Sequence, residues 1–388
     1  MPLHPIVEEL VALIAAHQWQ DDFEAAVRQA QQAQVPELAG LHSLDHFLQF
    51  INDFVTWLPV ENETGTRFYS KACAFYFILD QEPIAQYQNR VRPSAQQPEL
   101  TPLSQWILRY AQQMGRFMDS PESLTEETLA SFYRSPAYNM HEYIQPRGGW
   151  KTFNQFFARS VKPGYRPIAA IADATVITSP ADSVFIGQWE IRRDSAVTIK
   201  GLHWSIEELL AGSPYQQRFA NGLFCHAFLS PNDYHRQHAP VDGEVLEARV
   251  IPGQAYLQVI VDTTADGVNG PERRLVARRH LQAPDEAGYQ FAQARGLIVL
   301  DSPIGLVAVL PIGMAMMSSV VLTAEPGVTL RKGEEISYFQ FGGSDVVMLF
   351  EARSNVSITA QLGVHYNVGT RIAQAYPVCA RPPAVAAG

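Results

Sequence analysis

Residues 296–324 read GLIVLDSPIGLVAVLPIGMAMMSSVVLTA, and this stretch decides between a membrane span and a buried sheet. From Ser302 to Ala324 it carries no charge, which meets the length criterion for a membrane-spanning helix. Prolines, glycines and β-branched residues interrupt it, and these favour two buried strands around a turn at Pro311-Ile312-Gly313. We therefore expect a sheet here, with membrane association as the open alternative.

Short β-rich runs separated by turns lie on both sides of this stretch, from about Arg147-Gly148-Gly149 onward. They include ATVITSPADSVFIGQWEI (174–191), GEVLEARVIPGQAYLQVIV (243–261) and DVVMLFEARSNVSI (345–358). One helix interrupts them at 205–214, where Ser205 is the expected N-cap and Gly212 the expected stop. The pattern predicts that residues 150–388 form a mostly β domain.

The first part of the chain has apolar residues at the three- and four-residue spacing of helices. The predicted helical segments are 6–17, 21–32, 43–58, 71–81 and 103–118. Ser43 is a plausible N-cap, and Ser120-Pro121-Glu122 is typical of a helix start. Residues 1–140 are therefore predicted to be a helical N-terminal domain, and the fold class is α+β.

The composition indicates a globular chain with a negative net charge of −10. That charge argues against nucleic-acid binding and against simple attraction to an anionic membrane. Cys73, Cys225 and Cys379 are widely spaced and form no disulfide framework or CxxC motif. The N-terminus shows no basic region of a signal peptide, so we expect a cytoplasmic protein.

Reactive side chains lie beside turn-forming residues in three short segments: SPADS (179–183), SPNDYHRQH (230–238) and FGGSD (341–345). Together Asp182, His235, His238 and Ser344 supply an acid, two imidazoles and a hydroxyl, the components of a base-activated nucleophile. Taken singly, the acid could cap a turn, the histidines could be structural, and the glycines could form a turn or bulge. No HExxH, CxxC or carboxylate cluster accompanies the histidines, so we predict no metal.

The combination resembles a known family. Residues from about Phe153 to Phe350 resemble the phosphatidylserine decarboxylase family of pyruvoyl-dependent decarboxylases. The matching segments are FNQFFARSVKPGYRPI, SPAD, KGLHWSIEELL, LSPNDYHRQHAP with DG just after, VIPGQAY and KGEEISYFQFGGSDVVMLF. They cover about half of the chain in the family's order.

The resemblance implies a proenzyme that cleaves itself between Gly343 and Ser344, giving fragments 1–343 and 344–388 that stay partners. Ser344 would become a covalent pyruvoyl group, and no external cofactor would be needed. In the family pattern His238, polarised by Asp182, takes the Ser344 proton. The pyruvoyl ketone would accept the substrate amine as a Schiff base, and His235 would protonate the carbanion left by loss of CO2.

Two residues depart from the family pattern. Asp345 replaces a small hydroxyl residue after the nucleophile, and Ser183 replaces a glycine after Asp182. A carboxylate beside the scissile bond could slow or redirect cleavage. An uncleaved pseudoenzyme that acts as a binding protein is therefore a hypothesis of another class.

The helical region and the doubled glycine resemble the family's soluble branch, which includes fungal L-tryptophan decarboxylases. We therefore expect decarboxylation of a free aromatic L-amino acid, with tryptophan favoured. The alternative is phosphatidylserine, converted to phosphatidylethanolamine, for which the membrane is a disfavoured but open partner.

Two further groups bear on the substrate. Phe47, Phe54, Trp57 and Leu58 are expected in the core but could form a membrane-docking face. Arg273, Arg274, Arg278 and Arg279 are expected on a solvated strand but could bind a carboxylate or a phosphate.

Overall fold

The computed structural model describes residues 2–63, 65, 67–93, 99–199, 201–266, 276–282, 288–314, 320–341 and 344–378, with the backbone alone at 68, 263–266 and 276–282. Gly342, Gly343, Arg273, Arg274 and Cys379 lie outside the described residues, as do the side chains of Arg278 and Arg279. The helices are α1 (Pro5–His17), α2 (Gln20–Gln31), α3 (Leu44–Val55), α4 (Arg67–Leu79), α5 (Glu82–Ala85), α6 (Pro102–Met118), α7 (Glu126–Arg134), α8 (Phe153–Phe157) and α9 (Ile206–Leu210).

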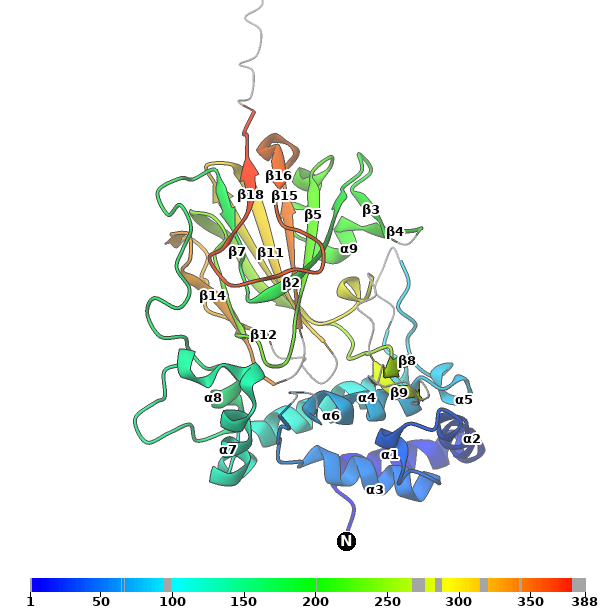
Figure 1. The fold of residues 1–388 in the computed structure, drawn as a ribbon. Coiled ribbons are helices and arrows are strands. Elements are labelled where there is room, and N and C mark those ends of the chain that lie inside the picture. Colours follow the sequence, from blue (N-terminus) through cyan, green and yellow to red (C-terminus); the bar gives the residue numbers. More distant parts are fainter. Residues whose placement is uncertain are drawn as a thin grey trace, which may run out of the picture.

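The strands begin after α8, and a helical region is thus followed by a mostly β region, which confirms the predicted α+β class (Figure 1). They are β1 (Val176–Thr178), β2 (Ser183–Glu190), β3 (Ala196–Ile199), β4 (Leu202–Ser205), β5 (Leu223–Leu229), β6 (Arg236–His238), β7 (Gly243–Ile251), β8 (Ile260–Asp266), β9 (Val276–Gln282), β10 (Arg295–Ser302), β11 (Gly305–Gly313), β12 (Val320–Leu322), β13 (Thr329–Leu330), β14 (Glu335–Phe339), β15 (Ser344–Phe350), β16 (Val356–Ile358), β17 (His365–Tyr366) and β18 (Arg371–Ala375).

The helices form where apolar spacing predicts them. Ser43 caps α3, because its Oγ accepts the backbone N–H of His46 at 3.2 Å. Ser120 does not start a full helix. Only a short 3₁₀ turn, Pro121–Ser123, follows it, and α7 begins after Thr125, whose hydroxyl forms a capping box with Thr128.

The largest sheet among the described residues has the antiparallel order β13-β7-β10-β11-β15-β5-β2-β17. Its central strands are buried on both faces: every residue of β11 and β15 is buried, and in β10 only Asp301 is exposed. This double burial explains the long uncharged run in the sequence, because a central strand covered on both faces needs no polar side chains.

The predicted turn at Pro311-Ile312-Gly313 is wrong. These residues belong to β11, and the turn lies earlier, where Ser302 of β10 is paired with Gly305. Gly305 has a φ of +118°, a conformation that favours glycine. Pro311 does not interrupt the strand: the pairs Arg295–Ile312 and Ile298–Val309 keep the same β10·β11 register on either side of it. Among the described residues, no helix is long and apolar enough to span a bilayer.

The two faces of the sheet bury two separate cores. Val346, Met348 and Phe350 join a large core that includes the helices, whereas Val347 and Leu349 pack on the opposite face against α9 and β4. Figure 1 shows the N-terminal helices lying together at one end of the strands. Phe47 and Phe54 of α3 belong to the large core, at 0% and 1% exposure, so they do not form an exposed membrane-docking face. Trp57 and Leu58 are half-buried.

Lys332 ties the loop before β1 to the strand region. Its ammonium group is buried and donates to the carbonyl oxygens of Ala170, Asp173 and Val176 at 2.8 to 2.9 Å. All three N–H groups are thereby used. The neighbouring Gly333 has a φ of +89°, and an added Cβ there would meet Ile168 at 2.6 Å.

We expect Lys332→Met to lower the free energy of unfolding by about 3 kcal/mol, because three carbonyl groups would lose their donor. The measurement is urea unfolding followed by circular dichroism. Lys162→Met is the matched control, because Lys162 is exposed and its ammonium group donates to the carbonyl oxygen of His141. For this variant we expect the free energy of unfolding to change by about 0.5 kcal/mol or less. Equal losses in both variants would contradict the role given to Lys332.

Candidate active site

Ser344 is the first residue of β15, and this strand is paired on both sides. Its backbone partners are Gly313 of β11 and Leu229 of β5. The side chain is fully buried. Because neighbouring side chains of a strand point to opposite faces, Ser344 shares the face of Val346, which packs in the core that includes the helices.

His235 is the imidazole that contacts Ser344. Its Nδ1 lies 3.4 Å from the Ser344 Oγ, and its Nε2 lies 3.2 Å from the carbonyl oxygen of Pro231. A carbonyl can only accept, so Nε2 carries the proton and donates it to Pro231. The lone pair of Nδ1 therefore faces the Ser344 hydroxyl, the orientation a general base requires.

The surroundings of His235 keep its imidazole neutral. The ring is completely buried and stacks on Phe157, with centroids 4.0 Å apart. Burial, and secondly the positive charge of Arg159, lower the pKa of His235 from 6.5 to about 3. The imidazole is thus neutral at neutral pH, and its Nδ1 lone pair is free to accept a hydrogen bond from the Ser344 hydroxyl.

Arg159 holds the turn that carries His235. Its guanidinium is buried and donates from Nη2 to the carbonyl oxygens of Asn232 and Asp233, at 2.8 and 3.2 Å. The group also lies over the ring of Tyr143, 4.1 Å from its centroid. Sequence reasoning did not select Arg159, although an arginine inside the apolar run FFARSV is a signal of a buried, bonded charge.

Asp182 is buried in the SPAD turn, and an arginine binds its carboxylate. The Nε of Arg166 donates to Oδ1 at 2.8 Å and to Oδ2 at 2.9 Å, and the backbone N–H of Val368 donates to Oδ1 at 2.8 Å. Arg166 also binds Glu142 at 2.8 Å. The sequence did not suggest Arg166 as a site residue, yet it satisfies most of the hydrogen-bonding capacity of Asp182.

His238 makes different contacts from those that the resemblance implies. Its Nδ1 donates to the carbonyl oxygen of Gly333 at 2.7 Å, and its Nε2 accepts from the Tyr234 hydroxyl at 3.0 Å. Burial lowers its pKa. Among the hydrogen bonds of the described residues, none joins His238 to Asp182 or to Ser344. The structure therefore brings His235, and not His238 with Asp182, to the Ser344 hydroxyl.

Asp345 points away from Ser344, on the other face of the sheet. Its Oδ2 lies 3.2 Å from the Nε2 of His226, and both side chains are buried. Gln290 lies beside the same ring nitrogen at 3.1 Å. Ser183, the other departure from the family pattern, donates its hydroxyl to the carbonyl oxygen of Ala181 at 3.2 Å. Neither side chain contacts the Ser344 hydroxyl.

The site thus offers a buried hydroxyl, a neutral imidazole oriented to accept its proton, and fixed charges that hold the surrounding turns. This arrangement is suited to activation of a serine oxygen. In the part of the chain that the structure describes, no group of three or more His, Cys, Asp or Glu side chains is placed to hold a metal ion.

Comparison with known proteins places the chain among relatives of one kind. The family model for phosphatidylserine decarboxylase matches residues 153–374. The phosphatidylserine decarboxylase proenzyme of Fusobacterium nucleatum is 32% identical over 237 residues, which are 61% of this chain and 71% of that protein. Proenzyme 3 of Schizosaccharomyces pombe is 37% identical over 238 residues, and proenzyme 2 of Oryza sativa is 32% identical over 243 residues.

The matched region covers 22% of the S. pombe protein and 36% of the rice protein, so this chain spans only part of these longer relatives. It contains all three segments singled out for their chemistry, from SPADS to FGGSD. A family model that matches more than half of the chain, and a bacterial relative matched over most of its length, lead to one conclusion. The chain belongs to the phosphatidylserine decarboxylase family.

Proposed function

We propose that this chain is a self-cleaving proenzyme, and that the mature enzyme decarboxylates phosphatidylserine to phosphatidylethanolamine. The observation that carries the proposal is the buried Ser344 hydroxyl, 3.4 Å from the accepting nitrogen of His235, in a chain of this family. The relatives, which are all named phosphatidylserine decarboxylase proenzymes, support both the cleavage and the substrate.

Cleavage begins when the Nδ1 of His235 accepts the Ser344 proton and the Oγ bonds to the carbonyl carbon of Gly343. The amide bond then breaks as its nitrogen takes the proton, which leaves an ester. Loss of the Ser344 Cα proton expels the Gly343 carboxylate and forms a Cα=Cβ double bond. Tautomerisation and hydrolysis release ammonia, and a pyruvoyl group remains at residue 344.

The residues present fit such a group, because Ser344 supplies its three carbons and the buried site holds an imidazole beside them. The pyruvoyl ketone supplies an electron sink for the carbanion that loss of CO2 creates. The chain's own residues do the rest. Phe157 and Phe341 cover the site and exclude water, and His235 can hold or return a proton at the reacting carbon.

Phosphatidylserine is favoured here over the free aromatic amino acid expected from the sequence. The comparisons give no support to an aromatic substrate, and the relatives' names give phosphatidylserine. The expectation of an aromatic substrate rested on the resemblance of the helical region and the doubled glycine to the soluble branch, together with the negative net charge. Membrane contact, however, depends on the local surface, which an overall charge of −10 does not describe.

The pseudoenzyme hypothesis loses its support from Asp345. That carboxylate lies on the opposite sheet face against His226, so it does not compete with the Ser344 hydroxyl for His235. Ser183 is likewise engaged with its own turn. A cleaving chain is the better proposal.

Intact-mass measurement of the purified protein should give two chains, 1–343 and 344–388, with a blocked pyruvoyl N-terminus on the smaller one. Ser344→Ala should remain a single chain and release no CO2 from phosphatidylserine in detergent micelles. L-tryptophan is the parallel substrate. Tryptamine formation without phosphatidylethanolamine would overturn the proposed substrate, and an uncleaved wild-type chain would overturn the proposed reaction.

The two histidines can be separated by variants. We expect His235→Asn to slow cleavage by about 100-fold or more, because it removes the base at Ser344. His238→Asn should slow it less, since His238 acts through Tyr234 and Gly333. The measurement is a time course on a denaturing gel. A cleaved His235→Asn chain beside an uncleaved His238→Asn chain would instead support the roles implied by the family pattern.

The lowered pKa of His235 predicts how stability depends on pH. Below about pH 6.5 the His235 imidazole binds a proton in the unfolded state but stays neutral in the folded state, where its pKa is about 3. The stability due to His235 is therefore complete above pH 6.5 and is lost as pH falls. In an uncleaved Ser344→Ala background, the His235 chain should lose about 1.4 kcal/mol more per pH unit below pH 6 than His235→Asn does.

His365 provides a control of opposite sign. The carboxylate of Asp233, 2.9 Å away, raises the pKa of His365, so its contribution to stability is lost as pH rises. Urea unfolding at pH 5 and pH 7 measures both effects. Parallel pH curves for the His235→Asn chain and its parent would contradict a neutral, buried His235.

A further inference from the structure

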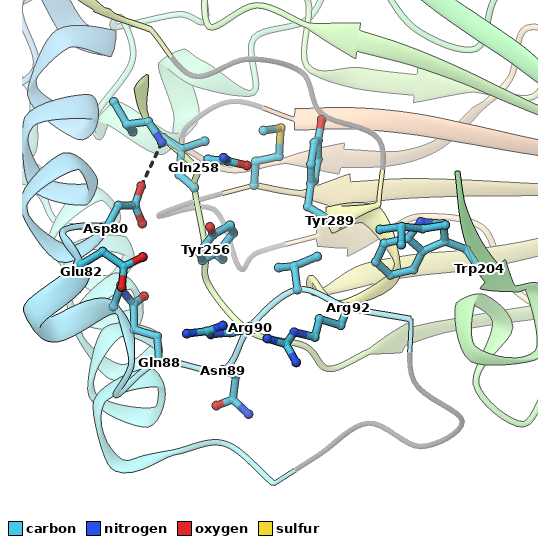
Figure 2. A pocket seen from close by; sticks show the side chains of 16 residues that line it. Asp80, Glu82, Gln88, Asn89, Arg90, Arg92, Trp204, Tyr256, Gln258 and Tyr289 are labelled. Carbon is cyan, nitrogen blue, oxygen red and sulfur yellow. Dashed lines mark hydrogen bonds between the residues drawn. The ribbon is translucent and has the colours of Figure 1, made fainter. Parts of the chain in front are cut away.

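A cavity of about 500 Å³ lies where the helical region meets the β region (Figure 2). Its walls come from the residue after α4, from α5 and the segment after it, from β4, from residues 256–259 just before β8, from Tyr289, and from Met314 just after β11. The residues that decide its character are Asp80, Glu82, Arg90, Arg92, Trp204 and Tyr289. The volume is within the usual range for small-molecule sites.

At neutral pH the side chains that line this cavity carry more positive than negative charge. Figure 2 shows the side chains of Arg90 and Arg92 directed into it. Asp80 accepts a hydrogen bond from the backbone N–H of Val259 at 2.9 Å, and burial raises its pKa to about 8, so at neutral pH it is mostly protonated. Glu82 is then the one remaining carboxylate among the lining residues, against the two solvent-exposed guanidinium groups. Two like charges lining one cavity repel each other, and a bound anion would remove that repulsion.

The opposite side of the cavity is apolar and well packed. Trp204 is 2% exposed and stacks on Phe291, with centroids 4.9 Å apart. Tyr289 and Met314 are also buried. The cavity therefore combines a cationic side with a rigid apolar side, a division suited to a polar head group that carries an apolar extension.

Its inner wall lies beside β11, the strand that is paired with β15. Met314 follows Gly313, and Gly313 is the backbone partner of Ser344. The Tyr289 ring meets His226 edge-on at 6.5 Å, and His226 binds Asp345. Met314 is thus next to the backbone partner of Ser344, whereas Tyr289 leads through His226 to Asp345, on the sheet face opposite to the Ser344 hydroxyl.

We propose that this cavity binds the phosphoserine head group of the substrate, with Arg90 and Arg92 on the phosphodiester. The proposal rests on the proposed function. The head group carries two negative charges and one positive charge, so its net negative charge is complementary to the net positive charge of the cavity. Guanidinium groups are well suited to phosphate oxygens because their N–H groups donate in a planar fork.

Both arginines precede the family-matched residues 153–374. The helical region would therefore supply a substrate-binding side that the matched region does not contain. Its role would be to position the head group, while Ser344 and His235 carry out the chemistry.

The test uses the uncleaved Ser344→Ala chain and calorimetric titration with glycerophosphoserine, the soluble head group without acyl chains. Arg90→Gln/Arg92→Gln should weaken binding about tenfold or more, the loss expected when charge-assisted hydrogen bonds are removed. Arg134→Gln, at the exposed end of α7 and outside the cavity, is the matched control and should bind as the parent does.

Inorganic phosphate and L-serine are the comparison ligands. Binding of glycerophosphoserine above both, and its loss in the double variant, would support the proposal. Equal binding by parent and double variant, no binding by the parent, or phosphate binding as tight as glycerophosphoserine would overturn it.

A second readout separates this proposal from the proposed function. Among fully cleaved chains, verified by mass, the double variant should raise KM for phosphatidylserine in micelles about tenfold, with the smaller effect on kcat. Unchanged KM with active wild-type enzyme overturns the cavity assignment alone. Head-group binding by a wild-type chain that does not decarboxylate phosphatidylserine overturns the proposed function alone.

Discussion

Backbone pairing of β15 on both sides is the constraint on which the site depends. Gly313 and Leu229 hold Ser344 between two antiparallel ladders, and the register decides which side chain meets His235. A slip of one residue would exchange the faces of Ser344 and Asp345. The carboxylate would then meet His235 and the hydroxyl would meet His226, so the strand register separates the nucleophile from its acidic neighbour.

Buried charges around this strand are bound by groups distant in sequence. Arg159 bonds to the backbone of the turn before His235, and Arg166 binds the Asp182 carboxylate. Lys332 bonds to the carbonyl groups of Ala170, Asp173 and Val176. The two arginines hold the turns that carry His235 and Asp182, at the cost of desolvation that these bonds offset. His235, in contrast, is kept neutral by burial, and its hydrogen bond to the Pro231 carbonyl leaves Nδ1 as the accepting nitrogen.

The helical region and the strands share one hydrophobic core, so the added helices are part of the site's support. Phe132 of α7 packs on Phe153 and Phe156 of α8. Phe157, at the end of α8, stacks on the His235 ring. A continuous aromatic path therefore joins the helices to the imidazole. At another part of this boundary, α5 and the segment after it line the cavity that contains Arg90 and Arg92.

Local patterns determined the helices, the α+β class and the candidate residues, because apolar spacing, caps and motifs are properties of neighbouring residues. The position of the β10–β11 turn was missed, since Pro311 is a turn signal locally but lies inside a paired strand. The choice between His235 and His238 was decided only by tertiary structure. These residues are three apart in sequence, and the Ser344 hydroxyl is 109 residues from His235. Long-range strand pairing and the packing of Phe157 and Arg159, which local sequence does not encode, select the imidazole that reaches the serine.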